Sequence, residues 1–379
     1  MRPRAARMLA WVAPLVLIGA IAVALLPWRR YAGAPPPREL LAGGNEPPAP
    51  RVAPELESLD RGALQAAADY AGEHGSRALI VSRHDHIVFE RYWQGSGFDT
   101  LADAQSFTPL LAALAVGVAI SHRQIGWPDE PIGALISEWR QDPRGAITVR
   151  NLLQSSSGLA PEAAARDRGT GLSAAALSEP LAGAPGSSRL EQPADAQLLA
   201  LLLERVTHQR YAVYLSQVLW RRIGAADAWL RLDHPGGAVH ADCCLLARQG
   251  DWIRIGQLLL RDGNYRGDEV IRPGWVTLMR MPSRADPRYG AYLRLGSPAA
   301  PAREPYAARD LFAVQGDEGN RLWLVPSLQI AILRTAPAGR DAGWDDSRVP
   351  NLIIRGARDY TPPAQPGADV SALVPAHKP

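Results

Sequence analysis

Lysine is almost absent from this sequence of 379 residues. The single lysine, Lys378, lies one residue before the end of the chain, and the position three residues earlier is Pro375 rather than a serine. A serine nucleophile that is activated by a lysine one helical turn away is therefore excluded anywhere in a folded core. A working hydrolase of this sequence needs a different proton acceptor.

Cysteine is nearly as rare, because the chain has only Cys243 and Cys244, side by side. Adjacent residues hold their Cα atoms about 3.8 Å apart. This is below the roughly 4.4 to 6.8 Å that separates the Cα atoms of most disulfides, so a bond between the two would be strained. We therefore expect two buried thiols.

Positive charge is concentrated at the N-terminus. The formal net charge of the chain is +3, yet the first 37 residues contain five arginines and no acidic residue. The rest of the chain is therefore slightly acidic, and it has no basic stripe or aromatic RNA-binding signature. Nucleic acid is not an expected partner.

An uncharged apolar run covers residues 8–28, with arginines on both sides. At about 20 residues it is long enough to cross a bilayer, and it exceeds the roughly 7 to 15 apolar residues of a cleavable signal peptide. Ala32-Gly33-Ala34 has the small residues of a cleavage site, but Pro35 follows it. We expect residues 1–30 to form an uncleaved single-pass anchor in an inner membrane, with a signal peptide as the alternative.

The remaining chain divides by composition. Proline, glycine and alanine are dense in residues 31–53, which predicts an extended tether. Residues 54–359 carry a helix, two strands, a long helical middle, further strands and a final helix. This order predicts an α/β domain in which an antiparallel sheet is flanked by helices and a helical domain is inserted. Residues 360–379 have no apolar period and are expected to be a mobile tail.

Residues 101–120 form a dense apolar stretch. Their pattern predicts a buried helix that starts near Ala102 and ends at the turn over residues 122–126. Within it, Ser106-Phe107-Thr108 and the following apolar run resemble the central helix of serine β-lactamases and penicillin-binding-protein-like hydrolases. That helix reads Ser-Met-x-Lys-Ser-Phe-Thr in the family.

Two further passages carry the same resemblance. Residues 147–159, Ile-Thr-Val-Arg-Asn-Leu-Leu-Gln-Ser-Ser-Ser-Gly-Leu, resemble the family's Ile-Thr-Ile-Arg-x-Leu-Leu-Thr-His-Thr-Ser-Gly-Leu. Residues 236–245 resemble a Gly-Gly…Cys-Cys-Leu-Asn segment of one branch. The resemblance covers roughly residues 54–359, and it implies a β-lactamase/transpeptidase-like fold whose globular part lies in the periplasm.

The resemblance also implies where the reacting groups should stand. In the family the serine is the nucleophile, and the lysine one turn later takes its proton. Aligning Ser106-Phe107-Thr108 on the pattern places Ala102 at the nucleophile position and Gln105 at the lysine position. Ser106 is the runner-up nucleophile, but on a helix it points about 40° beyond a full turn from position 102.

Two more elements of the family's site are replaced. Glu191 stands where the family has a tyrosine, and Asp195 matches its Asn/Asp position. In the third element Asp317 takes the place of a histidine and Glu318 that of a glycine, while Gly319 is retained. No cofactor and no metal are expected, since turns such as His84-Asp85-His86 commonly hold polar residues without a metal.

These losses favour a membrane-anchored pseudoenzyme that binds or scaffolds in the cell envelope. The alternative is an active esterase, amidase or β-lactamase-like hydrolase with a rearranged site. The expected partners are the membrane, through the N-terminal helix, and a small cell-envelope ligand or a protein. If the carboxylates at the positions just described gather in one cavity, they favour an amine over a carboxylate ligand. They are Glu191, Asp195, Asp317 and Glu318. The alternative is that they are solvated at its rim.

Overall fold

A computed structural model describes residues 35–161, 171–316, 319–337 and 343–362. The chain divides into two compact units, and the fold belongs to the second of them, residues 38–379. The expected anchor at residues 1–30 lies outside the described residues. No helix in the described part of the chain is long and apolar enough to cross a membrane.

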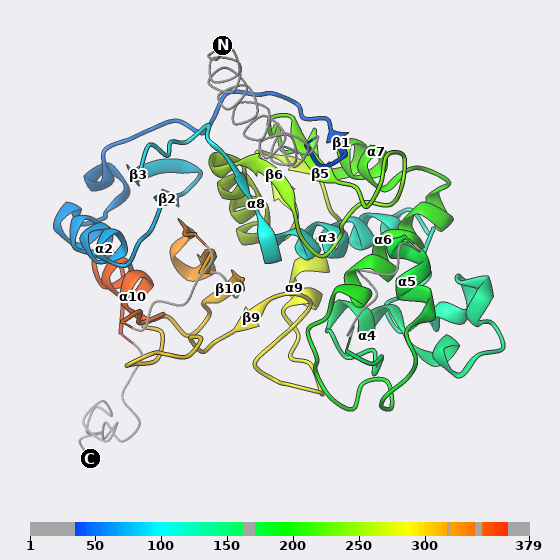
Figure 1. Ribbon diagram of the computed structural model, residues 1–379. Coiled ribbons are helices and arrows are strands. Elements are labelled where there is room, and N and C mark those ends of the chain that lie inside the picture. Colours follow the sequence, from blue (N-terminus) through cyan, green and yellow to red (C-terminus); the bar gives the residue numbers. More distant parts are fainter. Residues whose placement is uncertain (1–34, 162–170, 317–318, 338–342, 363–379) are drawn as a thin grey trace, which may run out of the picture. The chain divides into compact units, whose positions relative to one another are not determined.

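The larger sheet joins the two ends of the domain. It is antiparallel, with the strand order β3-β2-β12-β11-β10-β9. Figure 1 labels four of its strands, β3, β2, β10 and β9. The central strands β2 and β12 are buried along their whole length, because helices cover both faces. The strands are β2 (Ala78–Arg83), β3 (His86–Tyr92), β9 (Arg294–Leu295), β10 (Phe312–Gln315), β11 (Arg321–Val325) and β12 (Ile330–Thr335).

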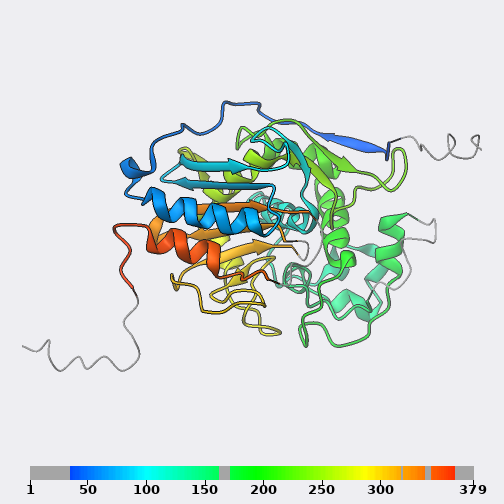
Figure 2. The same ribbon diagram turned by 60° about the vertical axis from the view of Figure 1, so that its left-hand side comes forward.

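Helices α2 (Arg61–Glu73) and α10 (Arg348–Arg355) lie side by side on one face of this sheet (Figure 2). Helix α8 (Gln249–Leu260) covers the other face. Asp60 caps α2 by accepting a hydrogen bond from the backbone N–H of Ala63. The first and last elements of the domain therefore pack together, which closes the fold around the sheet.

A smaller antiparallel sheet has the order β1-β5-β6-β4. Its first strand corrects the expected tether over residues 31–53. Arg38–Leu41 pairs with β5, Leu41 is fully buried, and Arg51 bridges to Ile87. Proline-rich composition predicts extended backbone, and extended backbone with free N–H groups can also add to a sheet edge. The strands are β1 (Arg38–Leu41), β4 (Leu101–Asp103), β5 (Ala228–Arg231) and β6 (Leu245–Arg248).

The helical region between the strands confirms the expected inserted helices. Its core is shared by α3 and α6, which pack against each other. The described helices of this region are α3 (Thr108–Ser121), α4 (Val149–Leu153), α5 (Leu172–Ser178), α6 (Pro193–Thr207) and α7 (Tyr211–Leu215). Helix α9 (Trp275–Met279) and the hairpin of β7 (Asn264–Tyr265) and β8 (Asp268–Glu269) follow α8.

The first turn of α6 carries a carboxyl group with no exposure to solvent. Asp195 is 0% exposed, and its Oδ1 lies 3.4 Å from the Nε2 of Gln192, which also donates to the hydroxyl of Ser157 at 3.1 Å. The Oδ2 atom of Asp195 has no partner among the described residues. Burial raises the pKa of Asp195 to about 7, against the smaller effect of the hydrogen bonds from Ser157 and Gln192.

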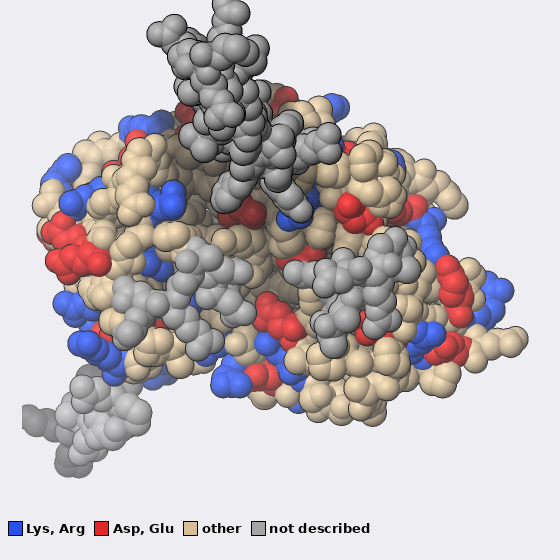
Figure 3. Space-filling view, in the orientation of Figure 1, with Lys and Arg blue, Asp and Glu red and all other residues tan. Residues whose placement is uncertain are grey.

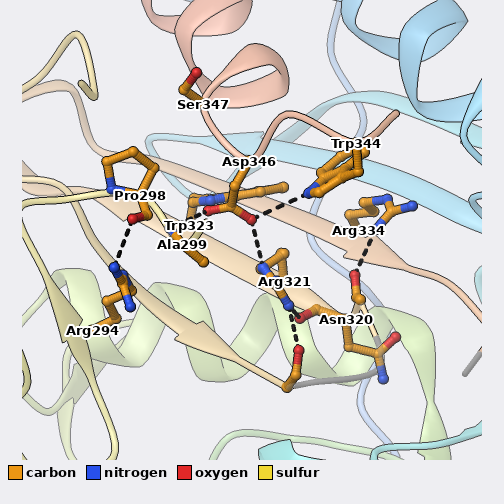
Figure 4. A network of polar contacts seen from close by, with 12 residues as sticks. Arg294, Pro298, Ala299, Asn320, Arg321, Trp323, Arg334, Trp344, Asp346 and Ser347 are labelled. Carbon is orange, nitrogen blue, oxygen red and sulfur yellow. Dashed lines mark hydrogen bonds and ion pairs between the residues drawn. The ribbon is translucent and has the colours of Figure 1, made fainter. Parts of the chain in front are cut away.

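A buried ion pair braces the turn between β10 and β11 (Figure 4). The Nε of Arg321 donates to Oδ1 of Asp346 at 2.7 Å, and its Nη1 donates to the carbonyl oxygen of Gly316. Asp346 also accepts from Tyr306 Oη at 2.7 Å and from the Ala299 N–H at 3.1 Å. The charges are thus paired and hydrogen-bonded inside the protein.

A second arginine holds the other end of the same turn. Arg334 donates to the carbonyl oxygen of Gly319 at 2.8 Å and to Ser76 Oγ at 2.7 Å. Its guanidinium carbon lies 3.8 Å from the ring centre of Trp344, within cation–π range. The carbonyl groups of Gly316 and Gly319 are therefore each held by a buried arginine.

The pKa of Asp195 predicts a pH-dependent stability. The folded protein keeps this proton up to about pH 7, whereas the unfolded chain loses it near its usual value of 3.8. Because the unfolded state binds fewer protons between these values, the free energy of unfolding should fall as pH rises from about 4 to about 7. The effect is at most about 4 kcal/mol. Asp195→Asn should remove this pH dependence. In urea unfolding, the free energy of unfolding of the variant relative to wild type should therefore be higher at pH 8 than at pH 4.

Glu138→Gln is the control for this experiment. Hydrogen bonds from Arg205 lower the pKa of the exposed Glu138 to about 2. The contribution of Glu138 to the free energy of unfolding therefore depends on pH in the opposite direction to that of Asp195. It is lost only as pH falls below about 4.5. An Asp195→Asn variant with the same pH profile as wild type between pH 4 and pH 8 would contradict the assignment.

The pair of Arg321 and Asp346 predicts a large loss of stability when one partner is neutralised. Asp346→Asn leaves the guanidinium buried without its counter-charge and should lower the free energy of unfolding by about 3 to 5 kcal/mol. Glu304→Gln breaks the more exposed pair with Arg355 and should cost about 1 kcal/mol or less. Equal losses in the two variants, measured by urea unfolding at pH 7, would show that the buried pair does not brace the fold.

Candidate functional site

The central helix begins later than the apolar pattern predicts. Leu101–Asp103 is strand β4, a 3-10 turn covers Gln105–Phe107, and α3 starts at Thr108. The expected start near Ala102 is therefore wrong. Ala102 pairs with Ala247 of β6, and the Ala104 N–H donates to the Leu245 carbonyl at 2.8 Å, so sheet pairing takes the backbone that a helix would need.

Gln105 marks the change from strand to helix. Its φ of 50° lies in the left-handed region, and its N–H donates to Oδ1 of Asp103 at 2.8 Å. Ala102 precedes this break, so Ala102 and Gln105 do not stand one turn apart on a helix. The structure instead brings Ser106 and Pro109 to the start of the helical segment, three residues apart.

The side chain of Gln105 connects the helix start to the braced turn. Its Oε1 accepts from Asn320 Nδ2 at 3.2 Å, and Asn320 Oδ1 accepts from the Ala336 N–H at 3.0 Å. Asn320 is buried. The residue aligned with the family's lysine is thus a neutral amide that is already hydrogen-bonded, and it joins two segments far apart in the sequence.

The third element is described only in part. Asp317 and Glu318 lie outside the described residues. Gly319 has a φ of 97°, which an L-amino acid with a side chain rarely adopts, and its carbonyl is held by Arg334. The retained glycine therefore has a backbone role in the turn.

Glu191 and Asp195 differ in their exposure to solvent. Glu191 is exposed and accepts from Arg189 Nη2 at 2.9 Å, while the guanidinium of Arg189 lies 3.6 Å from the ring centre of Tyr289. Asp195 is enclosed in the core. The two carboxylates do not face one open cavity, so the expectation that Asp195 joins a ligand-binding cluster is wrong, because its helix face is covered by Gln192 and the turn at Ser157.

Tyr292 is a neighbour of both carboxylates that the sequence did not point to. Its hydroxyl donates to the Leu152 carbonyl at 3.3 Å. Burial, followed by the nearby charges of Asp195 and Glu191, raises the pKa of Tyr292 well above its ordinary value. This phenol comes from a segment about a hundred residues later in the chain, so no local motif could reveal its place beside the two carboxylates.

Cys243 and Cys244 form a disulfide, which corrects the expectation of two thiols. Their Cα atoms are 3.7 Å apart, as adjacency requires. Cys244 adopts a φ of 69°, and this left-handed backbone brings the two sulfurs together. The pair immediately precedes β6, whose first residue, Leu245, holds the Ala104 N–H at the helix start.

The face seen in Figure 3 is hollowed near its middle, with acidic side chains around the hollow. A separate polar cleft of about 500 Å³ lies beside α4. The ion pair of Arg150 and Asp129, at 2.7 Å, lines this cleft together with Ser156 and Arg284. The described residues therefore include a space of ligand size next to the turn that follows α4.

The sequence profile of the family described as Beta-lactamase matches residues 64–336. A curated relative, the 6-aminohexanoate-dimer hydrolase of Paenarthrobacter ureafaciens, is 26% identical over 220 residues, which cover 52% of this chain and 55% of the relative. The chain therefore spans about half the length of this curated relative.

Solved structures share the fold at low sequence identity. A structure from Bacillus anthracis assigned to the 6-aminohexanoate-dimer hydrolases has a TM-score of 0.71 and 16% identity, covering 85% of this chain and 90% of that chain. A penicillin-binding protein homolog from Caulobacter crescentus has a TM-score of 0.61 and 15% identity, covering 78% of this chain and 97% of that chain. Together with the profile match over most of the domain, they confirm the resemblance read from the motifs: the chain belongs to the family of serine β-lactamases and penicillin-binding-protein-like hydrolases.

Proposed function

We propose that this chain is a catalytically silent member of its family, which binds a small cell-envelope ligand on the retained fold. The observation that carries the proposal is the start of the central helix. Ser106 stands there, but the residue three positions later is Pro109, and the only lysine of the whole chain is Lys378. The proton acceptor of the family's nucleophile has no counterpart on this helix.

A serine hydroxyl without a base is a weak nucleophile. Its activation needs an adjacent group that takes the proton as the hydroxyl attacks. Pro109 is buried and offers no acceptor side chain, and Gln105 is a neutral amide that is bonded to Asn320. Binding can survive such a loss, because a ligand site depends on shape and hydrogen bonds rather than on proton transfer.

The second candidate function is hydrolysis through Ser106. Ser106, the runner-up nucleophile, lies in the 3-10 turn that leads into the central helix, and the matched relatives are named as hydrolases. The proton would then have to pass to a carboxylate, and the sequence places Asp317 and Glu318 in the third element of the site. An acylation experiment distinguishes the two functions.

We expect no covalent adduct when the full-length protein is incubated with a labelled penicillin or a fluorophosphonate. Without the family's lysine the hydroxyl of Ser106 should not attack either reagent. Intact mass spectrometry measures the outcome, and an active serine hydrolase serves as positive control. A stoichiometric adduct that is lost in Ser106→Ala would overturn the proposal of a catalytically silent protein and support the hydrolase. Ser156→Ala, in the turn after α4, is the control and should keep such an adduct.

We also propose that residues 8–28 anchor the chain in an inner membrane with the globular part in the periplasm. The support is the length and lack of charge of this run. Membrane fractionation should recover the full-length chain in the pellet after washes with high salt and alkali. A soluble form that begins near Pro35 would show that the segment is a cleaved signal peptide.

A further inference from the structure

The loop before β6 gathers three metal-ligating side chains. One ring nitrogen of His240 and the sulfurs of Cys243 and Cys244 all lie within 4.8 Å of one another. All three residues are partly accessible to solvent. In the oxidised protein the two sulfurs are bonded to each other, so neither is a thiolate that can bind a metal.

The backbone holds this loop at both ends. The His240 N–H donates to the Arg231 carbonyl of β5 at 2.8 Å, and Leu245 pairs with Leu230 of the same strand. Between them, the Ala241 N–H lies 3.4 Å from Oε1 of the buried Gln197. The three side chains therefore start from fixed backbone positions that do not depend on the bond between the sulfurs.

We propose that reduction of the Cys243–Cys244 disulfide creates a binding site for a thiophilic divalent cation such as Zn²⁺. A dithiol reductant attacks one sulfur, forms a mixed disulfide and leaves as its own cyclic disulfide, which transfers two electrons and two protons to the cysteines. The cation then displaces both thiol protons and binds two thiolates and the neutral imidazole of His240.

The spacing suits a tetrahedral cation. Zinc–sulfur distances of about 2.3 Å at a tetrahedral centre place two thiolates roughly 3.8 Å apart, and the imidazole nitrogen lies about 2.0 Å from the metal. A separation within 4.8 Å therefore needs only small side-chain movements once the sulfurs part. Two cysteines and one histidine leave a fourth position for water, as in zinc sites with three protein ligands.

The surroundings of His240 also favour a cation. Its buried Nδ1 has no hydrogen-bond partner among the described residues, and Oδ1 of Asp242 lies 3.7 Å from it. The negative charge of Asp242 beside this imidazole adds to the attraction for a cation. Two thiolates and a divalent cation together carry no net charge, so the partly buried loop gains no uncompensated charge on binding.

The site lies next to the candidate functional site but does not depend on its function. Leu245, directly after Cys244, accepts the hydrogen bond from Ala104 at the helix start. The cation site therefore adjoins the segment that leads to Ser106, whether that serine is silent or reactive. The loop therefore binds the cation only when its two cysteines are reduced.

Cobalt titration of the full-length protein tests the site. The protein is reduced with dithiothreitol, desalted without oxygen and titrated with Co²⁺, whose thiolate complexes absorb through charge transfer. We expect one equivalent to bind to the reduced protein, displaceable by Zn²⁺, and none to the oxidised protein. Alkylation followed by mass spectrometry should find two free thiols after reduction and none before it.

Variants separate a built site from a chance pair of thiols. Cys243→Ser should abolish binding, and His240→Ala should weaken it by at least about tenfold, the smaller loss known for orienting partners of metal ligands. His234→Ala, on the same loop but exposed and paired with Asp233, should bind as wild type. Thermal unfolding checks that each variant is folded. If the Cys243→Ser variant does not fold, the Cys244→Ser variant takes its place in the titration.

Three results would overturn the proposal. They are a reduced protein without the thiolate–cobalt band, a folded His240→Ala variant that binds as tightly as wild type, and two free thiols before any reduction. The first two would show that these residues form no metal site, and the third would show that the site does not depend on reduction. None of them bears on whether Ser106 is acylated, so failure here is distinct from failure of the proposed function.

Discussion

The architecture depends on a helix that has no polar face. Every residue of α3 from Thr108 to Ala119 is buried, so the helix is stable only when other elements surround it completely. Small residues make this possible, since a Cβ at Gly117 would lie 2.4 Å from the ring of Trp275, whose Nε1 donates to the Ala113 carbonyl. The helical region and the sheets both pack toward this axis, which places its first turn where segments from distant parts of the chain meet.

Much of the fold could be predicted because its signals are local. The strand pair around the turn at His84, the strands on either side of residues 316–320 and the inserted helices all follow from runs and periods within a few residues. The start of the central helix could not, because Ala102 pairs with Ala247, and an apolar period does not record a partner that lies far along the chain. The same holds for β1, whose composition reads as a linker until β5 is known to lie beside it.

The candidate site was harder to predict than the fold, since burial decides the role of each charged residue. By sequence Asp195 and Glu191 look equivalent, yet one is enclosed with Gln192 and Ser157 and the other is exposed beside Arg189. Motif alignment put Ala102 and Gln105 one turn apart on a helix, whereas the break at Gln105 leaves Ala102 in a strand. The short distance between adjacent Cα atoms predicted that Cys243 and Cys244 would not form a disulfide. They do form one, with Cys244 in a left-handed backbone conformation.

The interactions that shape the site are independent of the groups that would react in it. Arg321 and Arg334 hold the turn between β10 and β11 through backbone carbonyls and Asp346, and the Leu245 carbonyl holds the helix start. None of these contacts uses the side chain of Ser106 or Gln105. The stability of this framework and any chemistry at the helix start therefore depend on different residues.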